Sequence, residues 1–180
     1  IPAAPQRDRY PLTFQQQSIY AQLLLNPDQD PYHMPGLFLL PPDTDLTRLK
    51  AALQQLCQDE EALQMAFVRE NGQLFFTLNP HPQLDIREAR WHDEANWSEW
   101  IQPFQLDQAP LMHVVLLHGP SQTGLFLDTH HLISDGLSTA LLMKKLDQYY
   151  SQMSSSSAAA RYRDLAWWQH QKENDSALSY

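Results

Sequence analysis

Two adjacent histidines, followed at short spacing by an aspartate and a glycine, form the part of this sequence best suited to chemistry. They are His130, His131, Asp135 and Gly136, in the segment Asp128-Thr129-His130-His131-Leu132-Ile133-Ser134-Asp135-Gly136. A histidine that titrates near neutral pH can take a proton from an amine or a hydroxyl nucleophile. A backbone amide at the start of a helix can stabilise a developing oxyanion. The segment is therefore a candidate site for proton transfer beside a developing negative charge.

The same residues also admit structural interpretations. Neighbouring residues of a β-strand point to opposite faces, so only one of His130 and His131 can face a given cleft, while the other packs. Asp135 is suited to capping the following helix, and equally to holding the turn by an ion pair or a hydrogen bond. A zinc site would use similar side chains, but no third ligand is spaced nearby, and we expect no metal.

The segments on either side predict the elements that position these residues. Alternating residue types predict two strands, 111–118 and 124–130, joined by a Gly-Pro-Ser turn, and the second strand brings the histidines to its end. A helix is predicted from about Gly136 to Tyr150, with three leucines expected to face inward: Leu137, Leu141 and Leu146.

The rest of the chain predicts further helices and strands. Up to residue 78 the sequence predicts a linker over 1–11, a helix from Thr13 to about Leu25 and a strand over 37–40. A second helix, capped by Asp43 or Thr44, has its apolar face at Leu46, Leu49, Leu53 and Leu56. A hairpin of strands 64–69 and 73–78 turns at Asn71-Gly72. Beyond residue 78 the remaining elements are a Trp-rich helix over 92–102, a flexible loop over 154–160 and a helix over 162–172. Strands mixed with helices, several as hairpins, indicate an α+β layered architecture.

Composition and charge exclude several classes of function. Twelve Lys and Arg stand against 21 Asp and Glu, a net charge of −9 that argues against nucleic acid or an anionic membrane surface as partner. No apolar run reaches the ~18 residues of a membrane helix, and no signal peptide is visible. The single cysteine, Cys57, lies in an apolar-periodic stretch and is interpreted as a buried hydrophobe that suits a reducing compartment. We therefore expect a cytoplasmic protein.

Several stretches together resemble the condensation domains of non-ribosomal peptide synthetases, within the chloramphenicol-acetyltransferase-like superfamily. The histidine segment matches the family signature H-H-x-x-x-D-G. Five others match in the family's order: Leu12 to Tyr20 (L-S-x-A-Q-x-R-L-W), Tyr32-His33-Met34-Pro35 (Y-N-I-P), Glu61 to Phe67 (E-x-L-R-T-x-F), Pro103 to Leu111 (the stretch before the central strand) and Tyr162 to Gln169 (Y-x-D-Y-A-x-W-Q). Gln64 and Ser18 depart from the pattern, each standing for a usual Arg, and His113 stands where another Arg is common.

The resemblance implies a fold and an extent. Residues 12–180 are similar to the N-terminal lobe of a V-shaped condensation domain, a two-layer sandwich, and the motifs of a second lobe are absent. Because the chain starts at Ile1 rather than Met, we expect it to be part of something longer. In the family the site lies in a tunnel between the lobes, so we expect the isolated lobe to fold but to be weakly active or inactive.

The resemblance also implies amide bond formation by acyl transfer. A donor acyl or peptidyl thioester on one peptidyl carrier protein would be attacked by the amine of an aminoacyl group on a second carrier. His131 would act as general base or as a positioning acceptor, and Gly136 would offer its amide near the thioester oxygen. His130 and Asp135 would support the site, and in the family the counterpart of Asp135 is held by an arginine.

Cofactors, partners and alternatives follow from the same resemblance. The lobe itself would bind no cofactor, since the 4′-phosphopantetheine arms belong to the carriers, and its other partners would be the second lobe and neighbouring synthetase domains. An epimerisation domain, a free-standing acyltransferase that uses coenzyme A, and a non-catalytic carrier-interaction lobe are the alternatives. A cyclisation domain is disfavoured because it replaces the histidines with aspartates.

Overall fold

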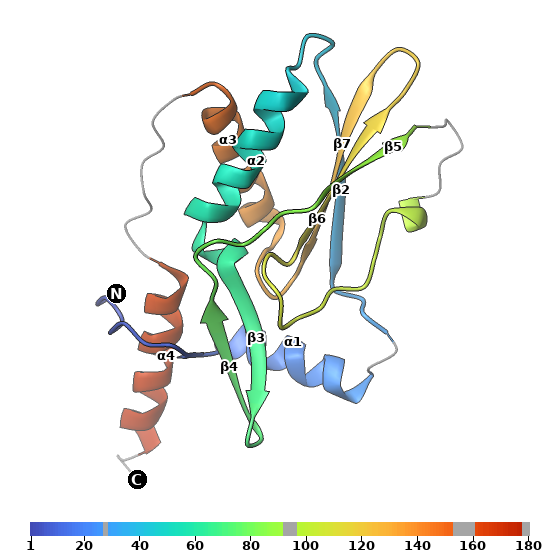
Figure 1. Cartoon of the computed structure of the whole chain (residues 1–180). Coiled ribbons are helices and arrows are strands. Elements are labelled where there is room, and N and C mark those ends of the chain that lie inside the picture. Colours follow the sequence, from blue (N-terminus) through green and yellow to red (C-terminus); the bar gives the residue numbers. More distant parts are fainter. Residues whose placement is uncertain (27–28, 92–96, 153–160, 178–180) are drawn as a thin grey trace.

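The computed structural model describes residues 1–26, 29–91, 97–152 and 161–177, which form two sheets and four α-helices (Figure 1). The larger sheet has the order β2-β7-β6-β5, and the smaller one has the order β1-β4-β3. Helices and strands alternate irregularly along the chain, and both sheets contain antiparallel neighbours. The α+β architecture expected from the sequence is therefore present.

The larger sheet is built around one central strand. β7 (Thr123–His130) pairs antiparallel with β2 (His33–Leu40) on one side and with β6 (Met112–His118) on the other, and every β7 residue from Gly124 onward is buried. β5 (Ile86–Arg90) adds a parallel edge strand beside β6. Two neighbours and two covered faces leave β7 no contact with solvent along most of its length, which makes it a rigid support for its C-terminal end.

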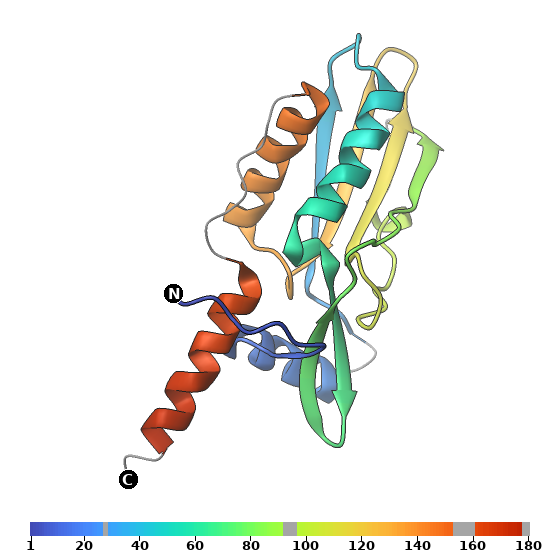
Figure 2. The ribbon, with the colours of Figure 1, turned by 60° about the vertical axis from the view of Figure 1, so that its left-hand side comes forward.

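Side chains of the larger sheet alternate between two apolar layers. Leu125 and Leu127 of β7 belong to the main core beneath α2 (Leu46–Asp59) and α3 (Gly136–Tyr150), which lie on one side of the sheet in Figure 2. Phe126 belongs instead to a smaller cluster on the other face, with Trp100, Val115 and Leu117. This is the two-residue period predicted for the strand.

The smaller sheet is a hairpin extended by a short N-terminal strand. β3 (Met65–Glu70) and β4 (Gln73–Leu78) meet at Asn71 and Gly72, whose φ values of 50° and 81° are those of a tight hairpin turn. β1 (Tyr10–Pro11) pairs with β4. The hairpin prediction is confirmed, but the expected linker over 1–11 is wrong at its end, because Tyr10 is 1% exposed and stacks on Phe76.

The first and last helices are joined by side-chain hydrogen bonds. α1 (Phe14–Leu25) begins with a capping box between Thr13 and Gln16, as the sequence predicts for Thr13. α4 (Tyr162–Ala177) reaches the start of the chain through Asp164, which accepts from the amides of Ala4 (2.8 Å) and Arg161 (3.1 Å). Figure 1 shows the N-terminal segment crossing α4.

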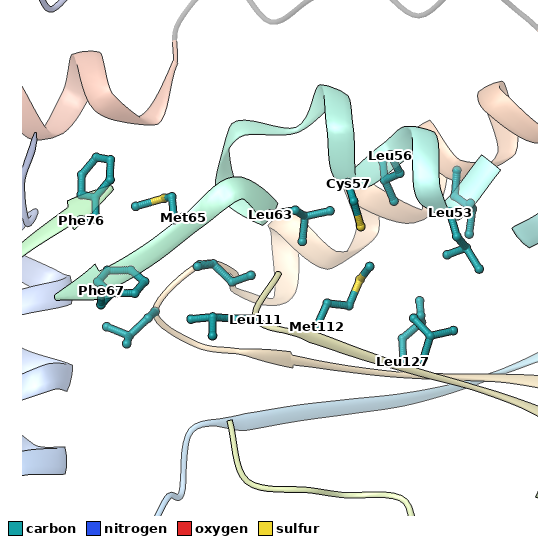
Figure 3. Packing of buried hydrophobic residues seen from close by; sticks show 14 of the residues in the cluster. Leu53, Leu56, Cys57, Leu63, Met65, Phe67, Phe76, Leu111, Met112 and Leu127 are labelled. Atoms are coloured by element: carbon teal, nitrogen blue, oxygen red, sulfur yellow. The ribbon is translucent and has the colours of Figure 1, made fainter. Parts of the chain in front are cut away.

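One continuous apolar core lies between the larger sheet, α2 and the hairpin (Figure 3). Leu53 and Leu56 of α2 pack into it together with Met112 and Leu127 of the sheet. Cys57 lies in the same cluster, is fully buried, and burial raises the pKa of its thiol to about 12. The interpretation of Cys57 as a buried hydrophobe is confirmed.

Four local predictions need correction. The strand placed at 37–40 begins at His33, and α2 is capped by Asp45 rather than by Asp43 or Thr44. Leu137 and Leu141 are 72% and 54% exposed, so of the three leucines expected to face inward only Leu146 is buried.

The Trp-rich helix and the strand β5 also differ from expectation. Of the helix expected over 92–102, residues 92–96 lie outside the described residues, and the rest contains only the short 3₁₀ turn η2 (Trp97–Glu99). No pattern in the sequence predicted β5, which has charged residues at three of its five positions. The predicted loop over 154–160 lies outside the described residues. Among the residues described, no helix has the length and apolar character needed to cross a membrane.

Shortening one core leucine tests the packing of α2 on the sheet. We expect Leu53→Ala to lower the free energy of unfolding by about 3 kcal/mol, because Leu53 is fully buried and the truncation leaves a cavity. Leu39→Ala is the matched control, with a change of less than about 0.5 kcal/mol, because Leu39 is 61% exposed. Urea denaturation of the 180-residue chain measures both, and equal losses would contradict this assignment of the core.

Candidate active site

The two histidines occupy different environments at the end of β7. The strand ends at His130, whose side chain is fully buried, and His131 opens the turn that leads to α3 and is partly exposed. The expectation that one histidine packs while the other remains accessible is therefore confirmed. Nδ1 of His131 is buried and has no hydrogen-bond partner among the described residues.

Hydrogen bonds from three directions hold the turn that carries His131. The amide of His131 donates to the carbonyl of Tyr32 (2.9 Å), and the amide of Leu132 donates to Nδ1 of His130 (3.0 Å). From α1, the buried Gln16 side chain donates its Nε2 hydrogen to the carbonyl of Leu132 (2.9 Å). The backbone of His131 and Leu132 is thus bonded to two distant parts of the chain and to the neighbouring His130 ring.

His130 is held in its neutral form. Burial lowers the pKa of His130 to about 4, against the opposing effect of the Asp30 carboxylate. Since Nδ1 of His130 accepts a hydrogen bond, the ring proton lies on Nε2. Nε2 of His130 is 3.3 Å from Oδ2 of Asp30, but it forms no hydrogen bond with any of the described residues. At neutral pH His130 therefore acts as an acceptor that fixes the turn.

Asp135 and Gly136 begin the helix α3. Oδ1 of Asp135 accepts from the amide of Ser138 (2.7 Å), and this contact with Ser138 holds the pKa of Asp135 below its usual range. No salt bridge to Asp135 occurs among the described residues, and Gln64 instead donates to the carbonyl of Gln58 (2.5 Å). The turn is thus held by a helix cap, the first of the two roles that the sequence allowed for Asp135.

Gly136 leaves open space beside the turn. A Cβ atom at this position would meet no other atom within 4 Å, and its φ lies in the range open to any residue. The contacts within this chain therefore do not require glycine here. Electrostatic interaction with His131 further lowers the pKa of Asp135.

A second polar cluster lies behind His130, on the sheet face opposite α2 and α3. Phe104 stacks on His113 at 4.2 Å and on His33 at 4.9 Å, and it meets the ring of His130 edge-on at 5.4 Å. Burial lowers the pKa of His113 to about 4, so this residue, standing in the place of a common Arg, is neutral at pH 7.

The carboxylate of Asp128 lies at the centre of this cluster and is fully buried. Its Oδ2 is 2.6 Å from Nδ1 of His33, and its Oδ1 accepts from the amide of Met34 (3.1 Å). Burial raises the pKa of Asp128, and the bond from His33 opposes that rise. Sequence reasoning did not identify Asp30, Asp128 or His33 as site residues, because their proximity depends on the pairing of β2 with β7.

Nothing in this arrangement adds a metal site. Among the described residues, no group of three or more His, Cys, Asp or Glu side chains could hold a metal ion. The site consists of His131 in a hydrogen-bonded turn, an open surface over Gly136, and the buried cluster behind His130. Such an arrangement places an imidazole on a hydrogen-bonded turn just before the start of a helix.

The neutral state of His130 makes stability depend on pH. In the unfolded chain His130 protonates near pH 6.5, whereas in the folded chain it stays neutral down to about 4. The unfolded state therefore binds more protons between these values, so the free energy of unfolding falls as pH is lowered from about 6.5 to about 4, by on the order of 3 kcal/mol.

His130→Asn tests this origin of the pH dependence, because the Asn carbonyl oxygen can still accept from Leu132 but does not titrate. We expect a shallower pH dependence of the urea midpoint in this variant, and no change of slope in His81→Asn, since His81 is exposed. If the urea midpoint of His130→Asn depends on pH as steeply as that of the wild type, the buried neutral imidazole of His130 is not the cause of the pH dependence.

Comparison with known proteins places this chain in a family. Residues 6–179 match the family described as condensation domain. The chain is 32% identical over 175 residues to surfactin synthase subunit 1 and 33% identical over 180 residues to surfactin synthase subunit 2, both of Bacillus subtilis (strain 168). These alignments cover 95% and 97% of this chain but only 5% of each synthase.

Solved structures show the same fold. The X-domain from teicoplanin biosynthesis, in its complex with OxyB, superposes with a TM-score of 0.85 at 19% identity, over 97% of this chain and 41% of that one. The starter condensation domain of rhizomide synthetase RzmA superposes with a TM-score of 0.78 at 19% identity, over 93% of this chain and 46% of that one. The fold expected from the motifs is confirmed, and the chain spans less than half of these solved structures. With its family match across nearly the whole sequence, this chain belongs to the condensation domain family.

Proposed function

We propose that this chain supplies the histidine-bearing wall of a site that forms amide bonds in non-ribosomal peptide biosynthesis. The observation that carries the proposal is the turn of His131, whose backbone is hydrogen-bonded to Tyr32, His130 and Gln16 at the end of a buried strand. An imidazole held in this way can meet a nucleophile without losing much conformational freedom in the reaction. The two synthase relatives support a role in a synthetase.

Each residue of the segment has a role in this proposal. His131 contacts the attacking amine, as a general base or as a positioning acceptor. The amide of Gly136 lies toward the thioester oxygen, where a donor at the start of a helix stabilises negative charge. His130 supports the turn as a neutral acceptor, and Asp135 supports it as the cap of α3.

The substrates in this proposal arrive on other proteins. The acyl and aminoacyl groups are thioesters on the 4′-phosphopantetheine arms of donor and acceptor peptidyl carrier proteins, and this chain holds no cofactor of its own. Attack of the amine nitrogen on the thioester carbonyl forms the amide bond, releases the donor thiol and transfers the acyl group to the acceptor carrier. A second lobe completes the tunnel, so the isolated 180-residue chain condenses weakly or not at all.

Removal of the imidazole tests the proposed catalyst. In the full-length protein that carries this chain, with loaded donor and acceptor carriers, we expect His131→Ala to lower the rate of acyl transfer by about 100-fold or more. Intact-mass spectrometry follows the acyl mass from one carrier to the other. His81→Ala is the matched control, because His81 is exposed in the loop between β4 and β5.

The other outcomes separate the alternatives. Exchange of the α-proton without acyl transfer would point to an epimerisation domain. If neither acyl transfer nor α-proton exchange occurs with any of several donors, the result would point to a non-catalytic lobe. Transfer that survives His131→Ala at the wild-type rate would overturn the role of this residue.

A second prediction concerns the cap of α3. Because Asn can accept the amide of Ser138 as Asp135 does, we expect Asp135→Asn to keep the free energy of unfolding within about 0.5 kcal/mol, whereas Asp135→Ala lowers it by about 1 kcal/mol. Acyl transfer should follow the same order, since the cap supports the turn rather than reacting. A large loss of transfer in a fully stable Asp135→Asn variant would instead show that the charge itself is required.

A further inference from the structure

Carboxylates and imidazoles alternate from Asp128, two residues before the end of β7, to the turn of His131. Oδ2 of Asp128 contacts Nδ1 of His33 at 2.6 Å, and Nε2 of His33 lies 3.8 Å from Oδ2 of Asp30. The same Asp30 oxygen lies 3.3 Å from Nε2 of His130. Nδ1 of His130 then accepts the amide of Leu132, the residue directly after His131.

The same groups fix the segment that contacts His131 from the other side. Tyr32 accepts the amide of His131 through its carbonyl, and its ring meets the His131 imidazole edge-on at 6.4 Å. Tyr32 is followed directly by His33 and Met34, which are both bonded to Asp128. Tyr32 is also held by its own amide, which donates to Oδ1 of Asp30 (3.0 Å), so its position over His131 depends on this bond together with the bonds of the next two residues to Asp128.

Packing restricts the His33 ring to one orientation. The side chain is 13% exposed and stacks on Phe104 at an interplanar angle of 28°. His113 lies directly opposite Asp128 in the pairing of β6 with β7, but it is neutral and its ring stacks on Phe104. Within the described residues, His33 is thus the only side chain that bonds to the buried carboxylate of Asp128.

We propose that His33 is a positioning residue for His131: its Nδ1 bond to Asp128 anchors the Tyr32 segment that holds the imidazole and backbone of His131 in place. The proposal rests on the proposed function of His131. His33 itself lies behind the sheet and acts through Tyr32, so it does not touch the substrate. Without the bond from His33, the buried carboxylate of Asp128 keeps only the Met34 amide as a partner. We expect the Tyr32 segment to shift so that water can reach the carboxylate.

Two substitutions at position 33 distinguish the contribution of Nδ1 from that of Nε2. Nδ2 of Asn is attached to Cγ as Nδ1 of His is, so His33→Asn keeps a donor toward Asp128. Gln places its amide nitrogen near the position of Nε2, so His33→Gln keeps only the side that faces Asp30. The stretch Y-N-I-P, which Tyr32 to Pro35 resembles, has Asn at this place.

The first measurement is acyl transfer in the full-length protein. We expect His33→Ala and His33→Gln to lower kcat about 10-fold with KM changed less than about twofold, because a misplaced catalytic group slows the reaction without weakening carrier binding. His33→Asn should retain kcat within about threefold, and His81→Ala should be unchanged. Equal losses in the Asn and Gln variants, or a loss confined to KM, would overturn the proposal.

The second measurement does not depend on catalysis. In the ¹⁵N-histidine-labelled 180-residue chain, we expect the ring signals of His131 to move in His33→Ala and His33→Gln and to stay near their wild-type positions in His33→Asn. If no condensation is seen in the wild-type protein, the proposed function fails, while these spectra still decide whether His33 positions His131. Unmoved His131 signals in all three variants would overturn the positioning role, and if His33→Ala fails to fold, the Asn and Gln pair decides.

Discussion

The buried carboxylate of Asp128 is the constraint on which the rest of the site depends. A charge with no exposure inside an apolar sheet must find partners, and here they come from the His33 ring and the Met34 amide. Both partners belong to β2, so satisfying Asp128 fixes the register between β2 and β7. That register in turn brings the carbonyl of Tyr32 to the amide of His131. The geometry at the end of β7 is therefore determined two residues inside the strand.

The first helix supplies the other fixed point of the turn. Gln16 uses both ends of its amide: Oε1 accepts from Thr13 to close the capping box, and Nε2 donates to Leu132. Because this side chain is 1% exposed, its two bonds link the start of α1 rigidly to the turn of His131. Gln16 belongs to the opening motif of the family resemblance. A stretch 116 residues away from Leu132 thus contributes to the site through one amide group.

Much of the fold follows from local patterns, whereas the cluster behind His130 does not. The hairpin at Asn71-Gly72 and the alternation along β7 depend on residues that are close together in the sequence, and the sequence predicted both. The motif H-H-x-x-x-D-G located His130 and Asp135, and their accepting roles follow from burial and a helix start. By contrast, the bond between His33 and Asp128 joins residues 95 positions apart, so it emerges only when the strands pair. Leu137 and Leu141 were misplaced because helical spacing marks an apolar stripe without telling what covers it.

The polar cluster behind His130 shows how Asp128 is paired although residue 113 is not a cation. A cation at position 113, opposite Asp128 in the β6–β7 pairing, would be a natural partner for its charge. In this chain His113 is uncharged at neutral pH because burial lowers its pKa to about 4, and its ring lies parallel to that of Phe104. The carboxylate instead takes its partner from the other neighbouring strand, at His33. Phe104 stacks on both histidines, and the bond from β2 keeps Asp128 paired and the Tyr32 segment beside the turn of His131.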